Sequence, residues 1–370
     1  MKKLGFGLMR LPLTDSNDTT SIELEEMKRM VDVFMKRGFT YFDTAYPYHN
    51  GHSEVALREA VVKRYDRDRF TVTDKMPCWA VNNEADLERI FNEQLERCGV
   101  DYFDYYWLHA MNKDYVKIMD RTHGWEFVQR KKTEGKIRHI GFSFHDDSKT
   151  LENILKAHPE MEYVQLQINY IDWSSPSIEA GTCYNLCEQY GKQVIVMEPV
   201  KGGSLAQVPD EVEQMFRRHN PEASPASWAI RYVASLPNVM MVLSGMSNVT
   251  QMEDNTSYME NFRPLDNEET AIIARAAGII KNNIDIPCTA CHYCTDGCPM
   301  SIAIPEYFGL MNTRRQFGDK EKSNTEYYYK TLTKTRGKAS DCIECGQCES
   351  HCPQHLPIIS ELKRVAEMFG

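Results

Sequence analysis

Hydrophobic and polar positions alternate over residues 1–275 in a pattern that predicts repeated strand and helix units. Short apolar runs between polar residues are typical of buried strands, and a longer amphipathic stretch with a helical period follows each run. Such helical stretches include Ile22–Lys36, Glu84–Cys98 and Ser224–Ser235. The eight predicted strands are Leu4–Met9, Thr40–Asp43, Phe70–Lys75, Asp104–His109, Ile137–Ser143, Tyr163–Asn169, Gln193–Met197 and Val239–Leu243.

Eight strand–helix units of this total length predict a (β/α)8 TIM barrel. A doubly wound open sheet is the alternative, but its G-x-G-x-x-G motif does not follow the first strand. We therefore expect an α/β fold whose working residues lie at the carboxyl ends of the strands, where such barrels place their active sites.

Two copies of one cysteine pattern lie near the end of the sequence. Both read C-x2-C-x2-C-x3-C-P. Bacterial ferredoxins use this run to bind [4Fe–4S] clusters, and the fourth cysteine of each copy usually binds the other cluster. Zinc sites also contain C-x2-C pairs, but two intact copies with the trailing proline favour iron and sulfur. One expected set of ligands is Cys288, Cys291, Cys294 and Cys352, and the other is Cys298, Cys342, Cys345 and Cys348.

The cysteine patterns divide the sequence into two predicted domains. Residues 1–275 form the barrel, and residues 276–370 form a small ferredoxin-like domain with two [4Fe–4S] clusters. Helical patterns at Tyr307–Asn312 and Glu326–Thr331 predict that the second domain is rich in α-helix.

Charge and apolar content exclude some classes of partner. The formal net charge of −10 disfavours nucleic acid and anionic membranes, because both repel an acidic protein. No apolar stretch approaches the ~20 residues that span a bilayer. Arg10 interrupts the apolar start of the chain too early for an export signal. We therefore expect a cytoplasmic protein, in which disulfides are uncommon.

Four residues suited to proton transfer lie at or just beyond the ends of adjacent predicted strands. They are Asp43, Tyr48, Lys75 and His109. Tyrosine is a weak acid with an ordinary pKa of ~10, and a nearby ammonium group lowers that pKa by stabilising the phenolate. We expect Asp43 to hold Lys75 charged and oriented. Tyr48 would then protonate a carbonyl oxygen as hydride reaches the carbon, while His109 orients the substrate carbonyl or shares its proton.

The segment 43–54, together with Lys75 and His109, resembles the aldo-keto reductase family; it reads DTAYPYHNGHSE. The resemblance covers residues 1–275 and implies a catalytic tetrad of Asp, Tyr, Lys and His in which Tyr48 is the general acid, with Tyr46 as an adjacent rival. The whole chain resembles a branch of the family with a C-terminal ferredoxin-like domain that holds two [4Fe–4S] clusters.

The same resemblance implies contacts to a nicotinamide cofactor. The implied positions are Ser143, Gln167, Met197, Gly245, Ser247 and Asn255. Met197 stands where the family has a stacking tyrosine, and Phe144 stands where it has an asparagine. The basic residues that bind the 2′-phosphate of NADPH in the family are missing after the eighth predicted strand, so the resemblance implies NAD(P)H without a choice between NADH and NADPH.

Three functions are consistent with these features. The first is an oxidoreductase that interconverts a carbonyl and an alcohol and exchanges electrons through two [4Fe–4S] clusters, with a ferredoxin or flavodoxin-like partner. Hydride carries two electrons, whereas each cluster passes one. Coupling the two would therefore make use of a bound flavin, and barrels can bind flavin phosphates without a short sequence motif. The second is an ordinary NAD(P)H-dependent reductase whose clusters are structural or sense oxygen. The third is a non-enzymatic, redox-sensing module that binds a small ligand.

Overall fold

The computed structural model describes residues 2–16, 18–175, 178–317 and 322–370. The chain folds as two compact units. The first unit contains most of residues 1–266, and the second contains residues 267–370 together with the segment Val200–Pro225. The two units therefore differ from the predicted division at residue 275, because a segment that lies within the barrel sequence packs with the C-terminal part.

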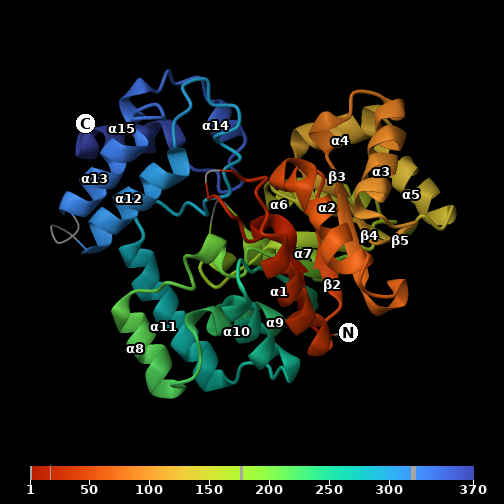
Figure 1. Cartoon of the computed structure of the whole chain (residues 1–370), viewed down its shortest axis with the longest axis horizontal. Helices are drawn as coiled ribbons and strands as arrows, with labels where there is room; N and C mark the ends of the chain where they lie inside the picture. Colours follow the sequence, from red (N-terminus) through yellow and green to blue (C-terminus); the bar gives the residue numbers. More distant parts are fainter. Residues whose placement is uncertain (1, 17, 176–177, 318–321) are drawn as a thin grey trace. The chain divides into compact units, whose positions relative to one another are not determined.

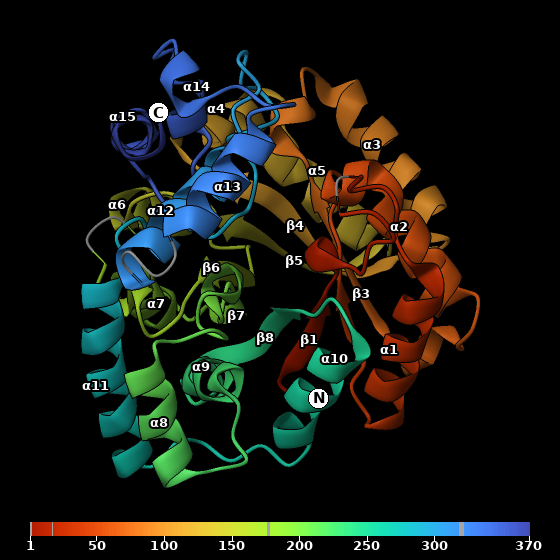
Figure 2. The same ribbon diagram turned by 60° about the vertical axis from the view of Figure 1, so that its left-hand side comes forward.

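The first unit is a closed barrel of eight parallel strands in chain order, with β8 paired to β1 (Figure 2). The predicted (β/α)8 fold is confirmed, and the ends of the predicted strands shift by only one or two residues. The strands are β1 Leu4–Gly7, β2 Tyr41–Asp43, β3 Thr71–Met76, β4 Phe103–Met111, β5 Ile137–Phe144, β6 Tyr163–Gln167, β7 Gln193–Met197 and β8 Val239–Gly245.

Helices follow the strands. Helix α3 matches its predicted bounds because both ends carry strong signals: Asn83 and Asp86 form a capping box at its start, and Gly99 ends it with a φ of 68°. None of the described helices is long and apolar enough to cross a membrane. The helices that belong to the first unit are α1 Leu24–Lys36, α2 His52–Leu57, α3 Glu84–Cys98, α4 Lys113–Arg121, α5 Gly124–Thr133, α6 Ser148–Ala157, α7 Ala180–Gln189, α9 Pro225–Ala234 and α10 Val249–Glu260.

Large side chains fill part of the barrel interior. Trp107 is fully buried and packs beside Tyr105 and Tyr163. Gly141 lies so close to this layer that a Cβ atom there would be 2.3 Å from the Tyr163 carbonyl oxygen and 2.7 Å from the Trp107 ring. A glycine is needed at that position because the backbone and the indole occupy the space of any side chain.

The second unit is rich in α-helix, as predicted. Figures 1 and 2 both show α8 beside α11 within this unit. In the described part of residues 267–370, the only strand-like pairing is a single parallel bridge between Ile302 and Gly337. Buried Tyr307, Phe308 and Val365 belong to its core. The helices are α8 Asp210–His219, α11 Asn267–Asn283, α12 Ile304–Phe317, α13 Lys322–Leu332, α14 Gln347–Ser350 and α15 Ile358–Phe369.

Candidate functional site

A buried ion pair joins the carboxyl ends of β2 and β3. The Lys75 Nζ lies 2.5 Å from Asp43 Oδ1 and donates a second hydrogen bond to the Thr44 carbonyl oxygen at 2.6 Å. The parallel register pairs Asp43 with Thr73, so Lys75, two residues further on, points to the same side of the sheet. Burial raises the pKa of Asp43 even though the Lys75 ammonium opposes that rise. The predicted Asp–Lys pair is therefore present in the structure.

Tyr48, in the short 3-10 helix Tyr48–Gly51 after β2, lies against this pair. The Lys75 Nζ is 4.9 Å from the centroid of the Tyr48 ring, and the ring meets His109 edge to face at 6.0 Å. Tyr46, the rival from the sequence, instead donates its hydroxyl to Glu93 Oε2 at 2.9 Å. Of the two tyrosines, Tyr48 is thus the one in contact with Lys75 and His109.

The protonation of Tyr48 differs from the expectation. Burial raises the pKa of Tyr48 well above its ordinary value, and the carboxylates of Asp43 and Glu198 raise it further. The predicted net lowering of this pKa is wrong, because the loss of hydration and the nearby negative charges outweigh the opposing charge of Arg10. Tyr48 is consequently a neutral phenol with a proton to donate at neutral pH.

His109, at the end of β4, is neutral as well. Burial lowers its pKa well below the ordinary value, and the charge of Lys75 and the nearby His145 lower it further. The ring is only 4% exposed, and its Nδ1 has no hydrogen-bond partner among the described residues. The Trp79 ring packs against it at a tilt of 50°, with ring centroids 5.1 Å apart. A buried nitrogen without a protein partner is suited to a polar ligand such as a carbonyl oxygen.

The implied cofactor positions on β5 and β6 are engaged with protein atoms. Ser143 Oγ accepts a hydrogen bond of 2.7 Å from the backbone nitrogen of Ala110, which follows His109. Gln167 donates to Asp172 Oδ2 at 2.8 Å, and Asn169 donates to the same oxygen at 2.8 Å. Both predicted side chains are buried where β5 and β6 end.

The implied positions at β7 and β8 include one side chain that supports the fold. Met197 is the last residue of β7, and Gly245 is the last residue of β8. The buried Asn255 donates to Ser244 Oγ at 2.9 Å and accepts from the Tyr258 hydroxyl at 2.7 Å. Its side chain therefore ties α10 to the end of β8.

Arg10 is a cation near these positions that the sequence reading missed. The Cβ of a residue at position 245 would lie 3.3 Å from the Arg10 side chain, and Ser247 Oγ donates to the Arg10 carbonyl at 2.8 Å. The Arg10 guanidinium is 3.8 Å from Glu198 Oε1. The predicted barrel could have revealed this proximity. Barrel closure pairs β1 with β8 and so brings the residues that follow the two strands together.

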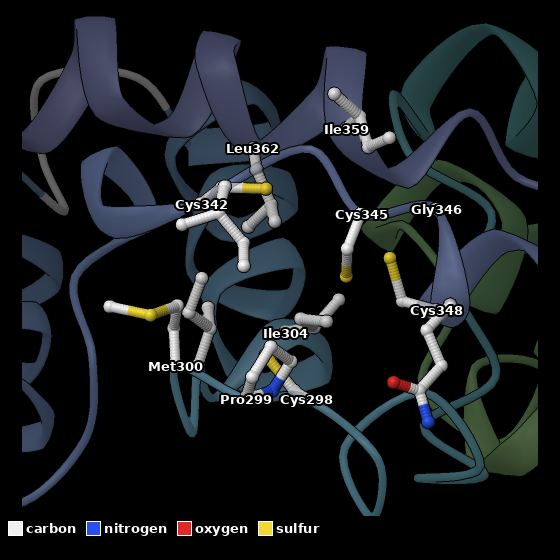
Figure 3. Close-up of a pocket in the computed structure, with 13 residues that line it drawn as sticks. Cys298, Pro299, Met300, Ile304, Cys342, Cys345, Gly346, Cys348, Ile359 and Leu362 are labelled. Atoms are coloured by element: carbon white, nitrogen blue, oxygen red, sulfur yellow. The ribbon is translucent and has the colours of Figure 1, made fainter.

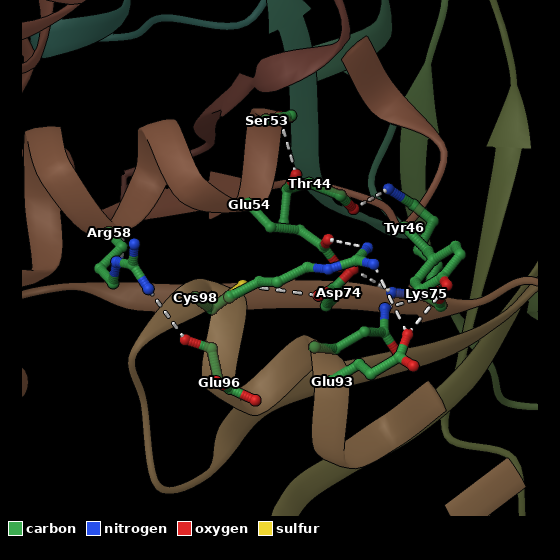
Figure 4. A network of polar contacts seen from close by, with 12 residues as sticks. Thr44, Tyr46, Ser53, Glu54, Arg58, Asp74, Lys75, Glu93, Glu96 and Cys98 are labelled. Atoms are coloured by element: carbon green, nitrogen blue, oxygen red, sulfur yellow. Dashed lines mark hydrogen bonds and ion pairs between the residues drawn. The ribbon is translucent and has the colours of Figure 1, made fainter. Parts of the chain in front are cut away.

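A second polar network lies around Glu54, within the motif that carried the family resemblance (Figure 4). The fully buried Glu54 and Asp74 lie together, and Arg97 Nη1 is 3.1 Å from Glu54 Oε2. Cys98 Sγ donates to Asp74 Oδ2 at 3.6 Å. Burial and mutual repulsion raise the pKa of Glu54, and burial raises that of Asp74. Two such carboxyl groups retain a proton between them.

The cysteines of the second unit line two pockets. Figure 3 shows the first of these spaces with its sulfur atoms around it. The sets are the ones that the crossed pattern predicts. We call the set Cys288, Cys291, Cys294 and Cys352 the inner cage. We call the set Cys298, Cys342, Cys345 and Cys348 the outer cage.

The donor atoms of both cages fit iron–sulfur clusters. No cysteine of the chain forms a disulfide in the structure of the described residues. Burial raises the pKa of Cys288 to about 11 and that of Cys348 to about 11. Burial therefore opposes thiolate formation at these two cysteines, a cost that a cationic metal offsets, and C-x2-C-x2-C spacing presents the sulfurs to a cubane.

Comparison with known families identifies the class of protein. The model of the aldo/keto reductase family matches residues 3–277, and that of the 4Fe-4S dicluster domain matches residues 287–356. The chain belongs to the aldo/keto reductase family and carries a C-terminal 4Fe-4S dicluster domain. It is an oxidoreductase.

Individual relatives are distant. The chain is 24% identical over 298 residues to the uncharacterized oxidoreductase YqkF of Bacillus subtilis, covering 73% of this chain and 90% of the relative. It is 26% identical to the glyoxal reductase of the same organism, covering 63% and 77%. The aldo-keto reductase AKR11C1 of Bacillus halodurans has the same fold, with a TM-score of 0.60 and 24% identity over 74% of this chain and 91% of that one. The aldo-keto reductase of Klebsiella pneumoniae solved in complex with NADPH gives a TM-score of 0.57 at 19% identity, covering 74% and 90%.

Proposed function

We propose that this protein interconverts a small carbonyl compound and its alcohol, with Tyr48 as general acid and base, and that the electrons pass through two [4Fe–4S] clusters. The observation that carries the first part is the position of the protonated Tyr48 between the Lys75 ammonium and the neutral His109. The second part is supported by the two cysteine cages in the same chain.

The protonated phenol is the source of the proton in reduction. Converting a carbonyl to an alcohol takes two electrons and two protons, of which one proton and both electrons arrive at carbon as hydride. Tyr48 gives the remaining proton to the carbonyl oxygen. The phenolate that it becomes lies beside Lys75, whose ammonium stabilises the new charge. In alcohol oxidation the same atoms run in reverse.

The neutral His109 and the buried ion pair position these groups. A neutral imidazole can donate one hydrogen bond to the carbonyl oxygen and leaves that oxygen free to accept the Tyr48 proton. Asp43 keeps Lys75 in place through the contact of 2.5 Å. Because both charges are buried, their attraction is screened little by solvent.

A bound nicotinamide would supply the hydride. Arg10 supplies a cation near Gly245 and Ser247, and its guanidinium suits a phosphate of such a cofactor. The Klebsiella pneumoniae relative bound to NADPH supports a nicotinamide here. Nicotinamide carries electrons only in pairs, so exchange with the one-electron clusters would need a bound flavin, which accepts paired electrons and passes them on singly.

Electron exchange is tested with the protein holding its clusters under anaerobic conditions. We expect roughly eight irons per chain for two cubanes. After reduction with dithionite and desalting into buffer that contains flavin, a panel of small aldehydes and ketones should reoxidise the clusters, with one alcohol formed per two cluster electrons. Cluster absorption and EPR follow the electrons, and chromatography follows the alcohol. Loss of this reaction in Tyr48→Phe would tie it to the barrel.

The competing function is an ordinary NAD(P)H-dependent reductase whose clusters are structural or oxygen-sensing. The glyoxal reductase relative and the Arg10 cation favour it. This second function predicts turnover with NADPH while the cluster spectra stay unchanged, and retention of turnover after the clusters are removed. Those two results together would overturn electron exchange through the clusters.

A further inference from the structure

The two cysteine cages differ in the side chains that complete them. Aliphatic side chains dominate the outer cage; they include Met300, Ile302, Ile304, Ile359 and Leu362. The inner cage has three polar residues in its lining, Thr289, His292 and Gln354. Thr289 and Gln354 are themselves buried, at 2% and 5% exposed. The inner cage is thus the more polar of the two.

A buried cation lies next to the inner cage. Lys201 is only 1% exposed, and its Nζ donates a hydrogen bond to Gln354 Oε1 at 3.2 Å. Burial raises the pKa of Cys288, and the charge of Glu306 raises it further; the charge of Lys201 opposes that rise, so its field reaches a cage sulfur. Lys201 and the inner cage belong to the same compact unit.

Backbone geometry holds this cation in place. Lys201 has a φ of 48°, and Gly202 has a φ of 65°, both in the left-handed region. A Cβ at Gly202 would lie 2.1 Å from the Thr289 carbonyl oxygen, so only glycine allows this segment to approach the backbone of the cysteine loop. Lys201 follows the last residue of β7, Met197, by four positions in the sequence.

We propose that Lys201 raises the reduction potential of the cluster in the inner cage. A cubane held by four thiolates gains one negative charge on reduction, and a fixed cation nearby stabilises that reduced state. Net charge and hydrogen bonding around a cluster are established determinants of its potential. Because Lys201 is buried, its charge acts through protein rather than through water and is screened little by salt. The inference assumes that both clusters bind, but it does not depend on the reaction at the barrel.

The test is an EPR-monitored redox titration of the cluster-loaded protein. Lys201→Gln should lower one of the two midpoint potentials and leave the other unchanged, at low and high salt alike. Lys201→Arg, which keeps the charge, should restore most of the lost potential. Lys363→Gln is the matched control, because Lys363 is 59% exposed and paired with Glu344 at 2.9 Å in the same unit. It should move neither potential.

A second variant keeps the test decisive if Lys201→Gln binds less iron. Gln354→Glu places a carboxylate against the Lys201 ammonium and should lower the same single potential, with the iron content retained. The proposal is overturned if both potentials stay where they are in the wild-type protein, or if both move together. Failure of carbonyl turnover would contradict the proposed function but would leave these potentials measurable.

Discussion

The barrel site and the cysteine cages bring their residues together in different ways. Asp43, Lys75 and His109 meet because parallel strands end at the same rim, so the barrel topology assembles them. In each cage, three of the four cysteines come from one short loop with fixed spacing, and only the fourth comes from the other copy. The barrel site therefore depends on tertiary structure for every contact, whereas most of each cage is local.

The two regions also differ in which charges they bury without a bound metal. The barrel site buries a complete ion pair beside two neutral groups, Tyr48 and His109. Burial in the cages opposes thiolate formation, which iron must overcome. The first region is ready for proton transfer as folded, whereas the second becomes functional only when it is loaded with metal.

Replacement of Tyr48 by Phe should have the largest effect on the barrel region. Loss of a general acid costs typically 10²–10⁴-fold in rate, and we expect a fall of that size in the turnover number of carbonyl reduction. Tyr46→Phe is the matched control, because the Tyr46 hydroxyl bonds to Glu93 instead. Steady-state kinetics of both variants decide the assignment, and a larger loss in Tyr46→Phe would reverse it.

Lys75→Met should destabilise the barrel by about 3–5 kcal/mol, because it leaves Asp43 buried without its partner. The free energy of unfolding from urea titration measures this change. In the double variant Asp43→Asn with Lys75→Met, much of the stability should return while activity stays lost. An additive loss in the double variant would show that the two residues are not energetically coupled.

The Glu54–Asp74 pair predicts a pH dependence of stability. Burial raises the pKa of Glu54 above its ordinary value of 4.5, so the folded protein keeps a proton that the unfolded chain releases. The free energy of unfolding should therefore fall as pH rises above about 5, by at most roughly 1.4 kcal/mol per pH unit. Glu54→Gln should flatten this slope between pH 5 and 9. Glu93→Gln, which removes the half-buried partner of Arg97, should leave it intact.

The crossed arrangement of the cages predicts the smallest change, a halving of iron content. Cys352→Ala should leave roughly four irons per chain and the same residual EPR spectrum as Cys288→Ala, because both remove the inner cluster. Cys298→Ala and Cys342→Ala should share the other spectrum. If Cys352→Ala matched Cys342→Ala instead, each pattern would hold its own cluster without crossing.

The sequence predicted the elements of the barrel well because their signals are local. Helix α3 has the predicted bounds Glu84–Cys98, since its caps lie next to it in the sequence. The sixth strand ends at Gln167, two residues before its predicted end, because the Asn169 side chain accepts hydrogen bonds from the backbone of Ile171 and Asp172 and turns the chain. No local pattern separates a strand end from such a side-chain turn.

The sequence by itself determined the barrel, the strand-end residues and the composition of the two cysteine sets, because periodicity and spacing are read directly along the chain. Only the tertiary structure decided the rest. Barrel closure brings Arg10 to Gly245, the packing of segment Val200–Pro225 brings Lys201 to Gln354, and burial sets the proton of Tyr48. Distances across the fold and loss of hydration depend on every packed neighbour, and a linear pattern does not contain them.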